Sequence, residues 1–236
     1  MAGIKSLVKD TAIYGVSSIV GRFLNWLLVP LYTAVFLPGE YGIVTYLYAI
    51  VAIGLIVLTY GMETAFFRFA NHEDVNDPMR VYSTSLIAVG TTSTLFFALL
   101  WIFLTPIAGA LRCADHPSYV WMLGLTLSID AFSCLPFSYL RYRERAMKFA
   151  TLKLVNIGLN ISLNLFFLLL CPWLWEHDPG LIAWFYDPTW GVGYIFLANL
   201  ISSAVVLLLL LPAIRGVGWR WDPALMRRML TYAYPL

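Results

Sequence analysis

Six long apolar stretches, separated by short polar gaps, make up most of the chain. They cover residues 11–36, 41–66, 82–110, 118–140, 151–175 and 190–214. Each has the roughly 20 residues that a helix needs to cross about 30 Å of hydrocarbon at about 1.5 Å per residue. The pattern therefore predicts an all-α polytopic membrane protein with a bundle of six transmembrane helices.

Lysines and arginines fall at the N-terminus and in every second gap between these stretches. The basic gaps are residues 67–81, 141–150 and 215–228. The other gaps carry acidic residues and a single basic one, and they cover residues 37–40, 111–117 and 172–189. Because short basic loops stay in the cytoplasm, we expect the N-terminus and the basic gaps inside and the other gaps outside.

The composition agrees with a membrane environment and argues against a nucleic-acid partner and a metal site. With 61% hydrophobic and 12% charged residues, the chain has too little polar surface for a water-soluble domain of its length. The formal net charge of +2 reflects orientation in the membrane rather than a nucleic-acid partner. The cysteines and histidines follow no metal-ligand spacing, so the sequence predicts neither a metal site nor a cofactor.

A short amphipathic link follows the sixth stretch, at residues 216–230. Asp222 followed by Pro223 is typical of a helix N-cap with a proline in the first turn. Arg227 and Arg228 then stand beside apolar residues. We expect a helix that lies in the inner membrane interface.

The last residues, 231–236, turn apolar again and predict the start of a truncated seventh transmembrane helix. Residues 1–215 then form a six-helix transmembrane lobe. Two connected six-helix bundles are a common transporter plan, and a link after helix six is where the second bundle begins. The chain is therefore expected to be a fragment or a half-length protein, which inserts but does not transport alone.

The first stretch carries a polar stripe of Ser18, Arg22 and Asn25. An arginine in mid-membrane costs about 2.5–3.5 kcal/mol on insertion scales, so it must face protein or water. A substrate site in a hydrated cavity is one interpretation. An arginine that pairs or snorkels to hold the bundle together is the other.

Two acidic residues also fall within apolar stretches. Glu63, near the inner end of the second stretch, can pair with Arg68 or take part in ion coupling. Asp130, near the middle of the fourth stretch, can serve as a counter-ion to Arg22 or as a proton carrier. Both are therefore candidates for a counter-ion or coupling site.

Three asparagines lie on one face of the fifth stretch, Asn156, Asn160 and Asn164, at i, i+4 and i+8. Amides with this spacing favour hydrogen bonds between helices, with cavity lining as the alternative.

Several motifs spread along the chain point to a family. They are Ser6-Leu7-Val8-Lys9-Asp10-Thr11-Ala12, Gly21-Arg22-Phe23, Pro30-Leu31-Tyr32-Thr33, Glu40-Tyr41-Gly42, Gly61-Met62-Glu63-Thr64-Ala65-Phe66-Phe67-Arg68-Phe69, Pro136-Phe137 with Leu140-Arg141, and Tyr234-Pro235-Leu236. Together they resemble the polysaccharide (O-antigen type) flippases of the multidrug, oligosaccharidyl-lipid and polysaccharide exporter superfamily.

The resemblance implies a MATE-like, two-lobed transporter of twelve or fourteen helices in the bacterial inner membrane. Such a protein flips a polyprenyl-diphosphate-linked oligosaccharide to the outer leaflet for lipopolysaccharide and other surface polysaccharides. This chain would supply the N-terminal lobe, with the C-terminal lobe and the lipid-linked substrate as its partners. Arg22 matches the first-helix basic residue that binds the diphosphate, and its planar donor fork suits that role.

Two other functions remain open. A MATE-like drug or organic-cation antiporter is the alternative among transporters, although Arg22 favours an anionic substrate. A membrane glycosyltransferase or polysaccharide polymerase is the alternative among enzymes, and it has only the acidic outer loop residues Glu176, Asp178 and Asp187 in its favour. We therefore expect a transporter and not an enzyme.

Overall fold

The computed structural model describes residues 15–16, 19–20, 23–24, 26–71 and 77–234, and in this part of the chain all regular structure is helical. The main helices are α2 (Leu28–Val35), α3 (Pro38–Thr59), α4 (Met62–Ala70), α5 (Pro78–Ile102), α6 (Leu104–Ala110), α7 (Pro117–Tyr142), α8 (Ala146–Leu165), α9 (Cys171–His177), α10 (Pro179–Ile182), α11 (Gly193–Ile214) and α12 (Pro223–Ala233). A π-helical segment, Phe166–Leu170, joins α8 to α9, and a short 3-10 turn, Pro188–Trp190, precedes α11.

Five helical stretches among the described residues are long and apolar enough to cross a membrane. They are Pro38–Ala70, Pro78–Ile102, Pro117–Tyr142, Ala146–His177 and Gly193–Ile214. They correspond to the second to sixth predicted spans, which confirms a polytopic membrane protein built as a helical bundle. Nine of the 26 residues of the first predicted span, 11–14, 17–18, 21–22 and 25, lie outside the described residues, and the C-terminal end of the span forms α2.

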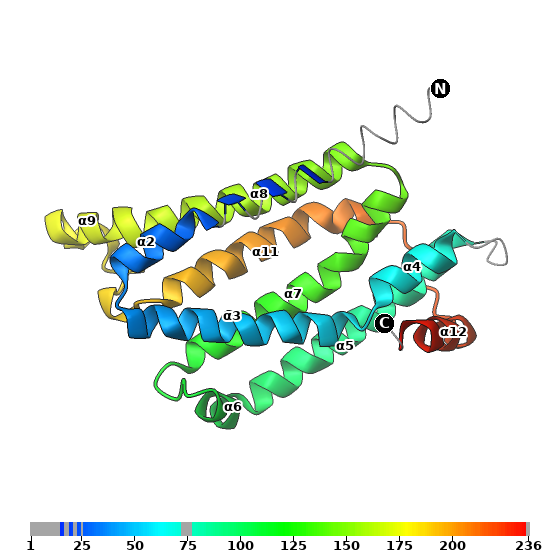
Figure 1. The fold of residues 1–236 in the computed structure, drawn as a ribbon, viewed down its shortest axis with the longest axis horizontal. Coiled ribbons are helices and arrows are strands. Elements are labelled where there is room, and N and C mark those ends of the chain that lie inside the picture. The colour runs from blue at the N-terminus through cyan, green and yellow to red at the C-terminus, as the bar shows by residue number, and fades with distance from the viewer. Residues whose placement is uncertain (1–14, 17–18, 21–22, 25, 72–76, 235–236) are drawn as a thin grey trace.

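Helix α7 is the centre of the bundle, with α5 and α11 as its main neighbours and α3 beside it (Figure 1). Its length and its position let it contact α4 and α8 as well. Helix α2 runs next to α8 on one side of the molecule (Figure 1). The residues that line a site in this lobe therefore come mostly from α7 and the helices around it.

Two of the predicted spans are interrupted. Tyr60 and Gly61 adopt left-handed backbone conformations, with φ of 34° and 68°, and separate α3 from α4. The predicted span 82–110 is wrong as one helix, because α5 ends at Ile102 and α6 follows as a separate short helix. An apolar run is a poor guide to such breaks because a change of backbone angle leaves its composition unchanged.

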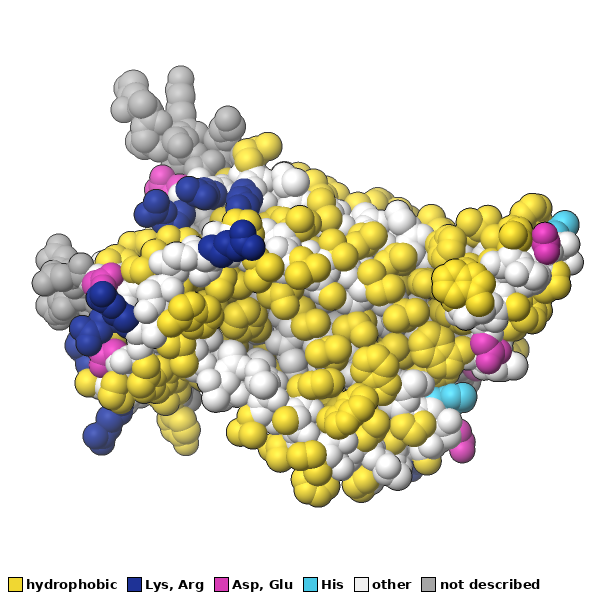
Figure 2. Space-filling model, turned by 180° about the vertical axis from the view of Figure 1, so that it is seen from behind, with side chains coloured by type: hydrophobic (Ala, Val, Ile, Leu, Met, Phe, Trp, Pro, Cys, Tyr) yellow, Lys and Arg dark blue, Asp and Glu magenta, His cyan; other side chains and the backbone are white. Residues whose placement is uncertain are grey.

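The two ends of the bundle differ in charge. Figure 2 shows most of the lysines and arginines gathered at one end and the histidines at the other, with acidic side chains at both ends. Helix α12 packs against α4 and α5 at the basic end. Asp222 caps it by accepting hydrogen bonds from the backbone N–H groups of Ala224 and Leu225, each at 3.1 Å, as the sequence predicts. Residues 231–233 continue this helix, and a seventh span stays a prediction.

Candidate functional site

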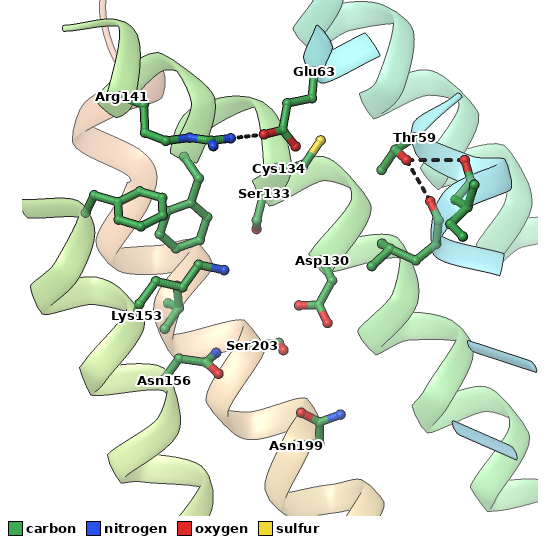
Figure 3. Close-up of a pocket in the computed structure, with 15 residues that line it drawn as sticks. Thr59, Glu63, Asp130, Ser133, Cys134, Arg141, Lys153, Asn156, Asn199 and Ser203 are labelled. Carbon is green, nitrogen blue, oxygen red and sulfur yellow. Dashed lines mark hydrogen bonds and ion pairs between the residues drawn. The ribbon is translucent and has the colours of Figure 1, made fainter. Parts of the chain in front are cut away.

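A cavity of about 530 Å³ lies between α3, α4, α7, α8 and α11 (Figure 3). Four charged side chains line it, namely Glu63, Asp130, Arg141 and Lys153. Hydroxyl and amide groups complete its polar lining, from Thr59, Ser133, Asn156, Asn199 and Ser203. Charged groups are costly within a membrane bundle, so their convergence on one space marks a candidate functional site.

Helical spacing brings these side chains together. Asp130, Ser133, Phe137 and Arg141 follow one another at three or four residues along α7 and so share one face. Lys153 and Asn156 are three residues apart on α8, and Asn199 and Ser203 are four residues apart on α11. All four line the same cavity (Figure 3). The cavity is where these three faces meet.

Arg141 forms an ion pair with Glu63, which joins α7 to α4. Its guanidinium also donates to Ser138 Oγ at 3.4 Å and lies 5.2 Å from the ring centroid of Phe67. The expected pairing of Glu63 with Arg68 is therefore wrong. The Arg68 guanidinium lies instead 4.4 Å from the ring centroid of Tyr232 on α12, and Arg68 is not among the residues that line the cavity.

Lys153 and Asp130 point into the same space from α8 and α7 (Figure 3). The Lys153 ammonium lies 4.3 Å from the ring centroid of Phe137, a cation–π distance. No carboxylate of the described residues lies within ion-pair distance of Lys153. Asp130 and Lys153 thus face one cavity without an ion pair between them.

The polar stripe of the first span falls on residues that the structure does not describe. Ser18, Arg22 and Asn25 all lie outside the described part of the chain. The predicted pairing of Arg22 with Asp130 and its predicted contact with a diphosphate therefore stay predictions.

The three asparagines of α8 have two different environments. Asn156 lines the cavity. Asn164 is fully buried and accepts a hydrogen bond from Tyr32 Oη of α2 at 3.0 Å. Its side-chain amide donates to the backbone carbonyl of Asn160 at 2.8 Å and to Asn160 Oδ1 at 3.1 Å. Both interpretations of the stripe thus apply, because one end lines the cavity and the other joins two helices.

The sequence pattern missed the two cations of the cavity. In the sequence, Arg141 stands in the basic gap 141–150 and Lys153 stands three residues after the end of that gap, so both look like loop charges, but α7 extends to Tyr142 and α8 begins at Ala146, which puts both on helices. The spacing of Lys153 could have identified it as a cavity residue. It stands three residues before Asn156 and so extends the stripe of asparagines by one helical turn. In the described part of the chain, no group of three His, Cys, Asp or Glu side chains could hold a metal ion.

Comparison with known proteins identifies a family for this chain. A family model described as polysaccharide biosynthesis protein matches residues 35–176, more than half of the chain. The matched part holds all four charged residues that line the cavity, namely Glu63, Asp130, Arg141 and Lys153. No curated protein and no solved structure matches the chain.

Proposed function

Since the chain belongs to the polysaccharide biosynthesis protein family, we propose that it acts as a flippase, which moves a polyprenyl-diphosphate-linked oligosaccharide from the inner to the outer leaflet of the bacterial inner membrane. The observation that carries the proposal is the cavity. Its charged and amide side chains converge between helices of membrane-spanning length. Such groups are retained in a membrane bundle where they face a substrate path.

The cations of the cavity are suited to an anionic diphosphate. Arg141 offers a planar donor fork, which can hold two phosphate oxygens at once, and Glu63 occupies that fork in this structure. Lys153 adds a compact positive charge from α8, on the same side of the cavity as Arg141 (Figure 3). We propose that the diphosphate exchanges with Glu63 for Arg141 and contacts Lys153, while Asn156 and Asn199 donate hydrogen bonds to glycan oxygens.

The first-span stripe and Asp130 complete the proposal. Arg22 is proposed to bind the same diphosphate, with Ser18 and Asn25 on its face of the helix. Asp130 is proposed as the counter-ion of the cavity cations in the absence of substrate. Uptake of a proton by Asp130 would release those cations, which couples substrate binding to protonation.

Flipping can be measured in proteoliposomes that contain the full-length protein and a fluorescent undecaprenyl-diphosphate oligosaccharide. A membrane-impermeant reductant destroys only the label on the outer leaflet, so the loss of label that starts in the inner leaflet reports flipping. We expect Lys153→Gln to slow flipping about tenfold or more, since it removes a charged hydrogen bond to phosphate. Lys148→Gln, on the same helix but outside the cavity lining, is the matched control and should leave the rate unchanged.

The first-span prediction uses the same assay. Arg22→Ala should abolish flipping with normal membrane abundance, and Arg22→Lys should restore only part of it because a point charge replaces a bidentate fork. Intact flipping in both Arg22→Ala and Lys153→Gln would contradict a diphosphate site in this lobe.

A cation antiporter is the second candidate, because the carboxylate of Asp130 shares the cavity with the rings of Phe137 and Phe149. The lining nevertheless holds as many cations as carboxylates, which disfavours a cationic guest. Proteoliposomes that take up ethidium when a pH gradient is applied, and lose this uptake in Asp130→Asn, would establish the antiporter instead.

We also propose that the protein is not an enzyme. A polymerase or glycosyltransferase needs an acid or base placed against the reacting sugar. Purified protein that lengthens a lipid-linked glycan from an activated sugar donor would overturn this part of the proposal.

A further inference from the structure

Two grooves run along neighbouring faces of α5 at the basic end of the bundle. The first, called here the α7 groove, measures about 850 Å³ and lies between α5 and α7, with Trp219 at its rim. The second, the α12 groove, measures about 710 Å³ and lies between α5 and α12, with Trp221 at its rim. Ile87 and Thr91 line both grooves, so their side chains form the ridge that separates them.

The connection between α11 and α12, residues 215–222, crosses α5 directly above this ridge. The backbone N–H of Arg220 donates to Ser83 Oγ at 2.6 Å, and Thr84 Oγ1 donates to the backbone carbonyl of Arg220 at 3.4 Å. Ser83 and Thr84 lie one helical turn before Ile87. These bonds hold Arg220 at the top of the ridge, with one tryptophan on each side.

The backbone of this connection is held in an unusual conformation. Trp219 has a φ of 42°, in the left-handed region that bulky residues avoid at a cost of about 1–3 kcal/mol. Trp219 is 58% exposed, and Trp221 is 48% exposed. Two half-exposed indoles at one end of a membrane bundle are typical of contact with lipid at the headgroup level.

Positive charge is concentrated at the same point. The Arg220 side chain is exposed. Arg80 stands two turns before Ile87 on α5, forms a 2.9 Å ion pair with Asp222, and keeps 52% of its side chain exposed. A guanidinium offers five donors, so one carboxylate does not saturate Arg80. Two partly or fully exposed arginines therefore lie beside the two apolar grooves.

We propose that this site binds an anionic diacyl phospholipid. Its phosphate lies on Arg220 and Arg80, and its two acyl chains straddle the ridge, one in the α7 groove and one in the α12 groove. Basic clusters beside membrane helices bind anionic headgroups in this way. Two grooves beside one pair of arginines match a lipid with two acyl chains. A polyprenyl diphosphate has a single chain and would fill only one of the two grooves.

Bromine on lipid acyl chains quenches tryptophan fluorescence on contact, and this tests the site in the full-length protein in nanodiscs. Dibrominated phosphatidylglycerol and dibrominated phosphatidylcholine are compared at equal mole fraction in an otherwise unbrominated phosphatidylcholine bilayer. We expect stronger quenching by the phosphatidylglycerol. The excess should vanish in the variant that carries both Trp219→Phe and Trp221→Phe, since it arises from these two indoles.

Arg220→Gln should remove the preference for the anionic lipid. Arg143→Gln, which neutralises another exposed arginine at the basic end, is the matched control and should keep it. Raising the salt concentration in the unsubstituted protein should weaken the preference as well, because the Debye length falls from about 10 Å at 0.1 M to about 3 Å at 1 M. This salt arm gives an answer even if Arg220→Gln fails to fold.

Three results would overturn the proposal. Equal quenching by both brominated lipids would mean that the grooves accept any acyl chain. A preference that survives Arg220→Gln and high salt would mean that these cations do not select the lipid. Undecaprenyl phosphate and unbrominated phosphatidylglycerol can each be added as competitors of the brominated lipid. If undecaprenyl phosphate displaced it at a far lower mole fraction, the site would belong to a single-chain lipid. None of these readouts depends on whether the protein flips a glycan.

Discussion

The helices α7 and α3 show how hydropathy and burial diverge in this protein. The stretch that contains α3 and α4 has a mean hydropathy of 2.3 but only 11% of its apolar window is buried, whereas α7 has a mean hydropathy of 1.5 and 67% buried. The more hydrophobic helix is therefore the less buried one. In a membrane, the hydropathy of a helix measures how readily its side chains contact lipid. Packing between helices depends instead on small and polar residues, which permit close approach.

The side chains of the two helices follow this division. On α7, Thr126 and Ser128 are buried, and each hydroxyl donates to the carbonyl four residues earlier, at 2.8 and 2.9 Å. On α3, Ile53, Ile56 and Val57 are 65%, 73% and 70% exposed. Helix α7 is thus built for protein neighbours, and α3 turns one apolar face outward.

The largest effect should come from removing a packed side chain of α7. Leu127 is 5% exposed and packs with Leu58 and Ala131, so Leu127→Ala should lower the free energy of unfolding by about 2–4 kcal/mol through the cavity left behind. Ile53→Ala on α3 should change it by less than about 0.5 kcal/mol. Reversible unfolding in mixed micelles of increasing SDS fraction measures both. Similar losses in the two variants would erase the contrast between the helices.

A smaller effect should follow from adding a side chain where α7 has none. A Cβ built on Gly124 would lie 2.5 Å from Leu100 Cδ1. Gly124→Leu should therefore cost about 1–3 kcal/mol through overpacking. Gly42 on α3 has no atom within 4 Å of such a Cβ, so Gly42→Leu is the matched control and should be tolerated.

Thermal unfolding followed with a thiol-reactive dye reports this pair of variants, because Cys113 and Cys171 are free and buried. Gly124→Leu should react at a lower temperature than the unsubstituted protein. An unchanged midpoint would mean that Leu100 moves aside without cost.

The smallest effect should come from removing a hydroxyl. Thr126 on α7 and Thr45 on α3 both donate to carbonyls of their own helix. Thr126→Val should cost less than about 1 kcal/mol, because the accepting carbonyl keeps its backbone donor, and Thr45→Val should have no measurable effect. SDS titration of the two variants sharpens the comparison. A loss above 2 kcal/mol for Thr126→Val would show that buried hydroxyls, rather than apolar packing, stabilise α7.

The apolar pattern predicts the spans from the second to the sixth because each run ends at proline, charge or a cluster of polar residues. It does not predict the break after Thr59 or the separation of α6 from α5, since both lie within apolar runs. Backbone angles at Tyr60 and Phe103 decide these boundaries, and packing against neighbouring helices selects those angles.

For the candidate site, an isolated polar residue in an apolar helix is the useful signal, and it finds Asp130 and Asn156. It fails for Lys153 and Arg141, which stand close to a basic loop, because local sequence does not show where α7 ends and where α8 begins. The pairing of Glu63 with Arg141 joins two helices that are distant in sequence, so only the fold reveals it.

The left-handed pair Tyr60–Gly61 has a consequence for hydrogen exchange. A helix leaves its first backbone N–H groups without intrahelical acceptors, so the start of α4 introduces such groups in the middle of an otherwise continuous apolar stretch. Amide protons at the start of α4 should then exchange with deuterium faster than those in the middle of α3. A map of deuterium uptake would thus show two segments, α3 and α4, where a hydropathy plot shows the single segment Pro38–Ala70.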